Sequence, residues 1–206
     1  MATRLPFFSV MFLGLASAVS TPLGSTKAFE QCTRLSLPVE RVTSRPAAYS
    51  EFCDAHPGDC DMAGSPVIEL TPAAQEKLDK VNREVNAEFR ITDDLEWRGK
   101  EEEWNYPSLG TGDCEDLALE KRRRLVKRGL PRAAMTMGIV FHKEFKCPHA
   151  ILFVETNEGT IVLDTLQSEM VCWDKAPLNY ESRERPDGRW DHFDQRLWEW
   201  SPLRPQ

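Results

Sequence analysis

Three side chains of this sequence have the types and the order of a thiol-based catalytic site. Cys114 opens a predicted helix directly after a glycine and an aspartate, whereas His149 and Asp164 each lie on an apolar run that is typical of a strand. A cysteine at a helix N-terminus meets unpaired backbone N–H groups and the positive end of the helix dipole, and both favour the thiolate. Each residue alone has an ordinary structural explanation, but the joint pattern predicts a nucleophile (Cys114), its general base (His149) and an orienting carboxylate (Asp164).

Acidic side chains crowd the same cysteine and oppose its ionisation, because negative charge nearby raises the pKa of a thiol. A bound cation would relieve this repulsion, and carboxylate oxygens at this density suit calcium. The alternative is that the acids only cap the helix and face water. Zinc is less favoured, because no histidine and cysteine spacing here makes a closed site. The calcium hypothesis has four candidate ligands: Asp94, Asp113, Glu115 and Asp116.

Two helices and three strands are predicted to position these groups. The cysteine-bearing helix is predicted to run from Cys114 to about Lys127, just before a glycine and a proline. A preceding amphipathic helix begins after Thr71, a good cap, and runs to about Arg90. Apolar runs predict the strands, at residues 135–141, 149–156 and 160–166.

The last two predicted strands are joined by a hairpin signal, Asn157-Glu158-Gly159. A two-residue turn would pair Ile151 with Asp164 and make His149 a diagonal neighbour of Asp164 on one face of the sheet. A three-residue loop would place them on opposite faces. The sequence leaves this register open.

The remaining segments are predicted to be irregular: residues 29–70, the acidic and tryptophan-rich connection 91–112, and the tail beyond residue 172, whose tryptophans we expect to pack on the sheet. Asn82 and Asn86 form a second row on the first helix. They suggest hydrogen bonds to a neighbouring loop, with solvent exposure as the equally favoured alternative.

The beginning of the chain has the pattern of a secretory signal peptide. Arg4 supplies a positive charge, residues 5–15 are apolar and small residues follow, and this run is too short to span a bilayer. We expect residues 1–28 to be the signal peptide and residues 29–206 to form a single domain. An uncleaved anchor is the alternative. The expected location is periplasmic or secreted, without stable membrane insertion after cleavage.

Export makes the six cysteines candidates for disulfides. Cys53 and Cys60 bracket a turn-rich loop and are predicted to pair. A free Cys114 would leave at least one further cysteine unpaired or paired between molecules. Two further bridges would instead occupy Cys114 and contradict an enzymatic role. The cysteines whose pairing stays open are Cys32, Cys114, Cys147 and Cys172.

Four short segments carry a family resemblance: Trp104-Asn105-Tyr106-Pro107-Ser108, Gly112-Asp113-Cys114-Glu115-Asp116, His149-Ala150 and Leu163-Asp164. With Asn82 and Asn86, they resemble the bacterial transglutaminase-like cysteine proteinases, which include the LapG-type periplasmic proteases. The resemblance implies an α+β fold with a papain-like, transglutaminase-like core, in which a cysteine-bearing helix packs on an antiparallel sheet. It also implies the triad above and a dependence on calcium. Leu117 and Thr165 depart from the family pattern, where we expect tyrosine and asparagine, and this puts the substrate preference in doubt.

The leading hypothesis is therefore an exported cysteine endopeptidase that cleaves a protein substrate, such as a cell-surface or envelope protein, through an acyl-enzyme. One alternative is an acyl transferase or amidase acting on cell-envelope amines or peptides with the same triad. Another is a non-catalytic binding module of the same fold. The net charge of −7 argues against a nucleic-acid partner.

Overall fold

The structure is a computed structural model that describes Met1, Phe29 and residues 31–100 and 102–198. The predicted signal peptide beyond Met1 lies outside the described residues, as does Trp200 of the tail. None of the described helices combines the length and the apolar character needed to cross a bilayer.

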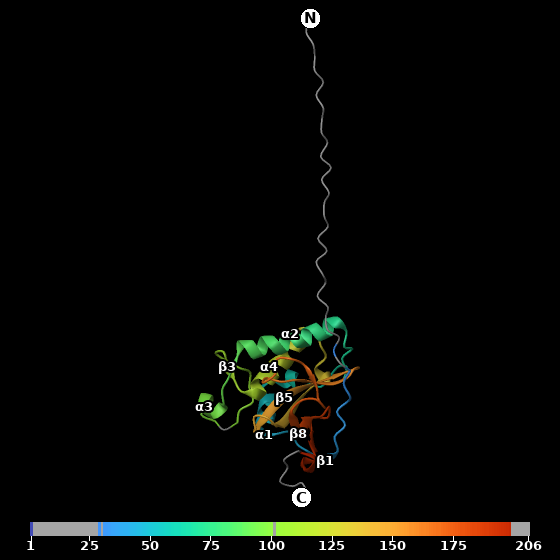
Figure 1. Ribbon diagram of the computed structural model, residues 1–206. Coiled ribbons are helices and arrows are strands. Elements are labelled where there is room, and N and C mark those ends of the chain that lie inside the picture. The colour runs from blue at the N-terminus through green and yellow to red at the C-terminus, as the bar shows by residue number, and fades with distance from the viewer. Residues whose placement is uncertain (2–28, 30, 101, 199–206) are drawn as a thin grey trace.

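A seven-stranded sheet forms the centre of the molecule (Figure 1). Its strand order is β1-β9-β8-β4-β5-β6-β7, and every neighbouring pair is antiparallel. The strands are β1 (Val39–Thr43), β4 (Met135–His142), β5 (Cys147–Thr156), β6 (Gly159–Leu163), β7 (Val171–Cys172), β8 (Leu178–Glu184) and β9 (Trp190–Phe193). Together with the helices described next, this sheet confirms the predicted α+β class.

Two helices cover the part of the sheet that carries the site. The helix α4 (Cys114–Lys127) packs against β5, and α2 (Pro72–Glu88) packs against α4 from the outer side (Figure 1). The bounds of α4 are those predicted from the sequence, and α2 ends within two residues of its predicted end. Apolar side chains of both helices and of the sheet form the main core, which includes Leu78, Leu117 and Leu152.

The hairpin between β5 and β6 adopts the two-residue turn. Leu152 pairs with Leu163 and Thr156 pairs with Gly159, which leaves Asn157 and Glu158 as the turn. This register confirms the alternative that places His149 and Asp164 on one face. Gly159 has a φ of +106°, and a Cβ atom there would lie 2.3 Å from the carbonyl oxygen of Cys32, so only glycine fits.

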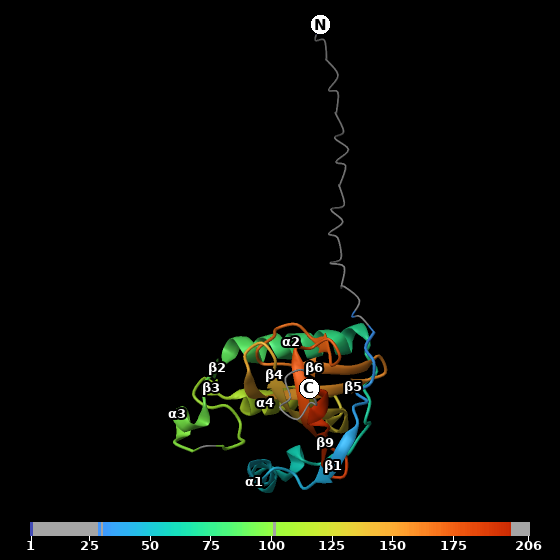
Figure 2. The ribbon, with the colours of Figure 1, turned by 60° about the horizontal axis from the view of Figure 1, so that its bottom comes forward.

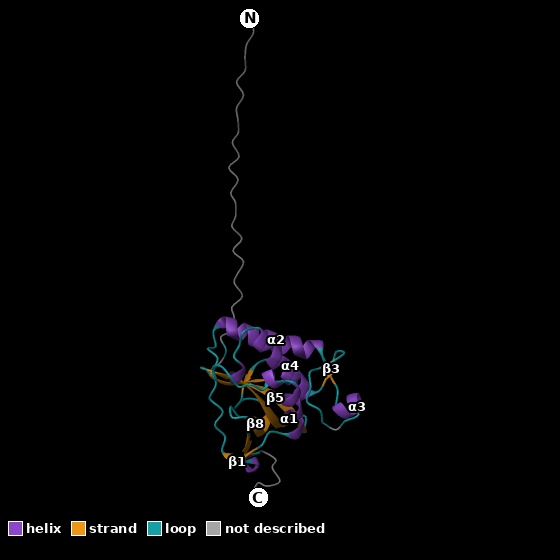
Figure 3. Cartoon of the chain, turned by 180° about the vertical axis from the view of Figure 1, so that it is seen from behind, coloured by secondary structure: helices purple, strands orange, loops and turns teal. Residues whose placement is uncertain are grey.

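Three segments predicted to be irregular contain regular elements, and those predictions were wrong. Residues 29–70 contain β1 and a helix, α1 (Ala47–Ala55), and the tail contains β8 and β9. The connection 91–112 contains α3 (Asp94–Arg98) and a small parallel pair, β2 (Arg90–Ile91) with β3 (Thr111–Gly112) (Figures 2 and 3). The apolar pattern does not reveal them, because β1 is largely exposed and β8 buries polar residues such as Glu184.

A buried ionic cluster fixes α4 to the sheet and to α1. Glu184 of β8 accepts hydrogen bonds from the Tyr49 hydroxyl at 2.6 Å and from Arg132 at 2.8 Å, and it forms an ion pair with Arg122 of α4 at 3.4 Å. The Met137 backbone N–H donates to the same carboxylate. Because buried charges are stable only when they are paired and hydrogen-bonded, this cluster defines one position of α4 on the sheet.

Two disulfides are present, Cys53–Cys60 as predicted and Cys32–Cys172, which closes most of the domain into one loop. Cys114 and Cys147 are free thiols. The pairing that would have occupied Cys114 is therefore absent from the described residues.

The two disulfides are expected to contribute unequally to stability. The Cys32–Cys172 pair spans 140 residues and the Cys53–Cys60 pair spans 7. In the chain-entropy account these loops correspond to about 5 and about 2.5 kcal/mol. Chemical denaturation of the C32S/C172S and C53S/C60S double variants is expected to show a loss about twice as large for the first pair. Equal losses would contradict this account.

Candidate active site

The site is built around the first residue of α4. Asp113 caps the helix, because its carboxylate accepts a hydrogen bond from the backbone N–H of Asp116 at 3.2 Å. Cys114 follows, and its Sγ accepts the backbone N–H of Ala150 on β5 at 3.3 Å. This contact places the thiol against β5 next to His149. Gly112 precedes the cap at a close approach, where a Cβ atom would lie 2.9 Å from that of Pro107.

His149 and Asp164 form a buried hydrogen-bonded pair. His149 Nε2 lies 2.7 Å from Asp164 Oδ1, and both residues are almost fully buried. The same oxygen accepts the backbone N–H of Leu166 at 2.8 Å. Because the carboxylate is the acceptor, we assign the proton to Nε2, which leaves Nδ1 as the basic nitrogen. Hydrogen bonding to His149 and Leu166 keeps the pKa of Asp164 below its ordinary value in spite of burial, which acts to raise it.

The two asparagines of α2 bind the loop that follows β6. Asn86 Nδ2 donates to the carbonyl oxygens of Asp164 at 3.0 Å and Gln167 at 3.1 Å. Asn82 Nδ2 donates to those of Gln167 and Ser168 at 3.0 and 2.9 Å. The alternative of hydrogen bonds to a neighbouring loop is therefore correct, and α2 fixes the backbone that carries Asp164.

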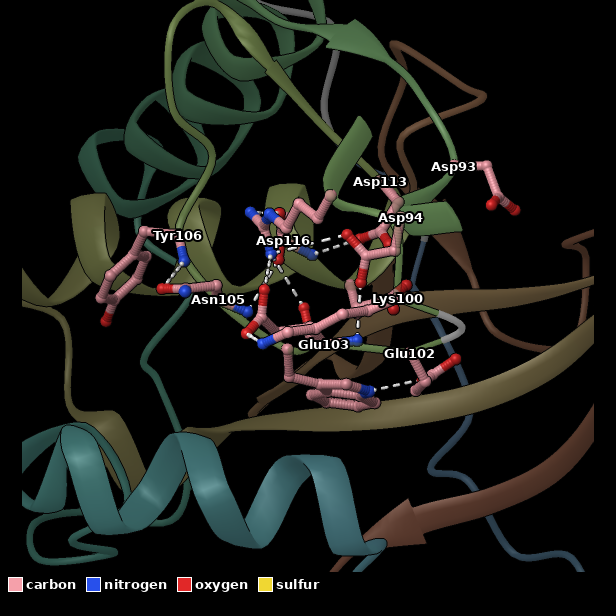
Figure 4. Close-up of polar contacts among 12 residues, drawn as sticks. Asp93, Asp94, Lys100, Glu102, Glu103, Asn105, Tyr106, Asp113 and Asp116 are labelled. Atoms are coloured by element: carbon pink, nitrogen blue, oxygen red, sulfur yellow. Dashed lines mark hydrogen bonds and ion pairs between the residues drawn. The ribbon is translucent and has the colours of Figure 1, made fainter. Parts of the chain in front are cut away.

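Carboxylates surround the thiol, as the sequence predicted. The side chains of Asp94, Asp113 and Glu115 each offer an oxygen within 4.8 Å of the others (Figure 4 shows Asp94 beside Asp113). Burial and the charges of Asp94 and Glu102 raise the pKa of Asp113 to about 6. Burial and the charges of Asp113 and Glu102 raise the pKa of Glu115 to about 9. The Cys114 thiol donates to Glu115 at 3.1 Å. Burial of the sulfur and then the charges of Glu115 and Asp113 raise the thiol pKa well above its ordinary value.

Asp116 does not join this group. One of its oxygens accepts Arg98 at 2.7 Å and the other accepts the backbone N–H of Asn105 at 2.7 Å (Figure 4). Both oxygens are thus used within the protein, although burial and Asp113 raise the pKa of Asp116 to about 8. Asp116 connects the Trp104–Ser108 segment to α4, and we leave it out of the candidate metal ligands.

Two residues near the acidic group carried no recognisable sequence signal. Arg98 of α3 lies 3.5 Å from Asp94 and also binds Asp116, so one guanidinium serves two of the acids. Glu102 accepts the indole N–H of Trp104 at 2.7 Å, and its charge raises the pKa of both Asp113 and Glu115 (Figure 4). Both residues lie on the connection that was predicted to be irregular.

The two departures from the family pattern lie inside the protein. Leu117 is fully buried in the main core, and Thr165 is buried beside Asp164, where its hydroxyl makes no hydrogen bond with a described residue.

Solved structures with a similar fold include LapG from Legionella pneumophila. Its calcium-bound and EGTA-treated forms each match with a TM-score of 0.51, at 21% and 22% sequence identity. The alignments cover 71% and 73% of this chain and 81% of each LapG chain. At this identity, the likeness establishes the fold alone. No curated protein gives a match.

A family model gives the decisive comparison. The model described as bacterial transglutaminase-like cysteine proteinase matches residues 39–197, which include the helix with Cys114 and the hairpin with His149 and Asp164. Because this match spans most of the chain, the protein belongs to the bacterial transglutaminase-like cysteine proteinases and is a cysteine peptidase.

Proposed function

We propose that the protein is an exported endopeptidase that uses Cys114 as nucleophile, His149 as general base and Asp164 as the orienting carboxylate. The observation that carries this proposal is the 2.7 Å hydrogen bond from His149 Nε2 to Asp164, formed beside the residue whose N–H binds the Cys114 sulfur. A thiol at a helix N-terminus, a buried imidazole and a carboxylate hydrogen-bonded to it are the groups that this mechanism requires.

The reaction follows from the roles of the three groups. His149 Nδ1 takes the proton of the Cys114 thiol, and the sulfur attacks the carbonyl carbon of a peptide bond. The backbone N–H of Cys114, at the first position of α4, is suited to stabilise the oxyanion that forms. The C–N bond then breaks, His149 returns the proton to the leaving amine, and a thioester remains on Cys114. Water attacks the thioester with His149 again as base, the C–S bond breaks, and the Cys114 sulfur takes the proton from His149 as the carboxylate product leaves.

We further propose a calcium ion held by Asp94, Asp113 and Glu115. The donor set fits a hard cation: three carboxylates converge, one Asp94 oxygen is buried without a hydrogen bond to the described residues, and Arg98 is shared with Asp116. When bound, the ion would supply positive charge that offsets the carboxylates beside the thiol. The calcium-bound form of the LapG fold relative agrees with this proposal.

Export is part of the same proposal. Two disulfides in a domain of this size suit an oxidising compartment, and the first residues have the pattern of a signal peptide. The substrate is then a protein of the cell envelope or the cell surface.

Product analysis separates the peptidase from the acyl transferase. Purified protein is incubated with isolated envelope proteins, with and without a small primary amine, and the products are identified by mass spectrometry. We expect cleaved chains with free carboxylates, which are absent with the Cys114→Ala variant. Amine incorporation that exceeds hydrolysis would overturn the endopeptidase assignment. The reaction rate of Cys114 with a thiol probe is then compared between folded and denatured protein. If the folded protein reacts no faster, the non-catalytic binding module is favoured.

A further inference from the structure

A second histidine lies beside the proposed general base. In the pairing of β4 with β5, Val140 is opposite His149 and His142 is opposite Cys147. His142 is therefore a diagonal neighbour of His149 on the same face of the sheet. The ring centroids of the two histidines are 6.1 Å apart, and the ring planes cross at 69°. This distance and this angle are those of an edge-to-face contact between two rings.

The loop between β4 and β5 holds the His142 ring in one orientation. The Nδ1 atom of His142 accepts the backbone N–H groups of Glu144 and Phe145, each at 3.3 Å. The His142 carbonyl oxygen accepts the N–H of Lys146 at 2.8 Å, which closes the loop. The Phe145 ring lies 4.6 Å from that of His142. These contacts fix the ring that touches His149.

Neither packing alone nor loop anchoring alone explains a histidine at this position. Because Nδ1 is an acceptor, the proton of the His142 ring is on Nε2. His142 is 0% exposed, and its Nε2 makes no hydrogen bond with a described residue. A buried N–H without a partner is unfavourable, and a phenylalanine ring would avoid this penalty. An asparagine would supply the acceptor for the loop, but without a ring.

The imidazole of His149 needs a second support besides its hydrogen bond. Within the described part of the chain, its side chain makes one hydrogen bond, to Asp164 at 2.7 Å. Because the χ2 torsion of a histidine has broad minima, one hydrogen bond still allows the ring to tilt about Nε2. Such a tilt moves Nδ1, the atom that takes the Cys114 proton in the proposed mechanism. A second ring packed against the imidazole opposes this movement, because protein interiors are close-packed.

We propose that His142 is a positioning residue of the catalytic site, whose ring holds the His149 imidazole at the tilt that directs Nδ1 to the nucleophile. The inference rests on the proposed roles of Cys114, His149 and Asp164. Histidine combines the two features that this position requires, a ring for the contact with His149 and an acceptor atom for the loop. A misplacement of about 1 Å at a reacting group costs about a hundred-fold in rate, so loss of the ring is expected to lower kcat by about ten- to a hundred-fold.

Two substitutions separate the ring from the acceptor. H142F keeps an aromatic ring beside His149 and removes the acceptor, whereas H142N keeps an acceptor and removes the ring. H142N is expected to lower kcat by the factor above with an unchanged KM, and H142F is expected to keep the kcat of the wild type. The matched control is H192N. His192 lies on β9, which β8 and β4 separate from β5, and its Nε2 is 3.0 Å from the Thr43 hydroxyl, so both kinetic parameters are expected to stay unchanged.

The kinetic parameters are measured on an envelope protein that the wild type cleaves, and NMR of the ¹⁵N-labelled protein reports on the two contacts separately. Exchange of the His149 Nε2 proton with water is expected to be faster in H142N than in the wild type and unchanged in H142F. The backbone amides of Glu144 and Phe145 are expected to show the reverse, with faster exchange in H142F and no change in H142N. Melting curves identify any variant that has lost its fold.

Three results would contradict the role of His142: a wild-type kcat in H142N, a loss in H142N that lies in KM alone, or a folded H142F with a kcat as low as that of H142N. If H142N does not fold, the kcat of H142F and the exchange of its His149 proton decide the proposal. A wild type that cleaves no envelope protein would overturn the proposed function instead. The exchange of the His149 proton needs no turnover, so it would still test the contact between the two rings.

Discussion

Alanine in place of Cys114 is expected to abolish peptide cleavage, a loss of about a million-fold in kcat, because no other described group at the N-terminus of α4 is placed to form the acyl-enzyme.

Asparagine in place of Asp164 is expected to lower kcat less, by about a thousand-fold. The Leu166 N–H donates to Oδ1, so the amide oxygen of asparagine must take that position and still accept His149 Nε2–H. The tautomer survives and only the charge is lost, whereas a wrong tautomer costs about ten-thousand-fold.

The matched control for this series is C147S. Cys147 is the second free thiol and opens β5, the strand of His149, but it makes no part of the proposed triad. Initial rates on a cleaved envelope protein and melting curves of each variant separate lost chemistry from lost folding. C114A with more than a few per cent of wild-type activity, or C147S with a comparable loss, would show that the nucleophile is assigned to the wrong residue.

The parts of the site that the sequence predicted are those with local signals. The bounds of α4 follow from a capping aspartate and a following glycine. Cys114 and His149 lie on the predicted helix and strand, whereas Asp164 follows the end of β6 at Leu163, although the predicted strand extended to residue 166. The sequence is compatible with both a two-residue and a three-residue turn in the hairpin, and these give different registers. Only the pairing of Leu152 with Leu163 in the structure decides between them.

The rest of the site depends on contacts between distant segments. Asp113 and Asp116 are three residues apart, yet only Asp116 is bound by Arg98 and by the backbone of Asn105. The sequence alone does not indicate which of the two aspartates is left to bind a cation. Lys121 is a different case, because this fully buried residue occupies the apolar face of α4 in step with Cys114, Leu117 and Ala118. A charged residue at such a position conflicts with the helical pattern, and conflicts of this kind are expected at functional sites.

Removal of calcium is expected to lower activity at pH 7 by about a hundred-fold, because burial and the charge of Asp113, no longer offset by the ion, keep the Cys114 thiol protonated. Calcium at a hundred times its Kd is expected to stabilise the fold by about 2.7 kcal/mol, or about 5–10 °C in Tm. Activity and melting curves of chelator-stripped protein, before and after calcium is restored, measure both effects. If the rate and the Tm are both unchanged after the chelator treatment, the proposed calcium site is wrong.

Glu115→Gln separates the ion from the repulsion that it relieves. In stripped protein the pKa of Glu115 is about 9 in the folded state against an ordinary value near 4.5, so the folded chain binds more protons than the unfolded chain between those values. Stability of the stripped wild type is therefore expected to fall as pH rises through this window, and calcium should cancel the fall. E115Q is expected to be more stable than the wild type without calcium at pH 8 and to gain less stability from the ion.

The control E76Q, at an exposed position of α2, is expected to follow the wild type with and without calcium. A stripped wild type whose Tm does not decline from pH 5 to 9 would mean that burial and the charge of Asp113 do not raise the pKa of Glu115. The reason for a cation beside Cys114 would then disappear.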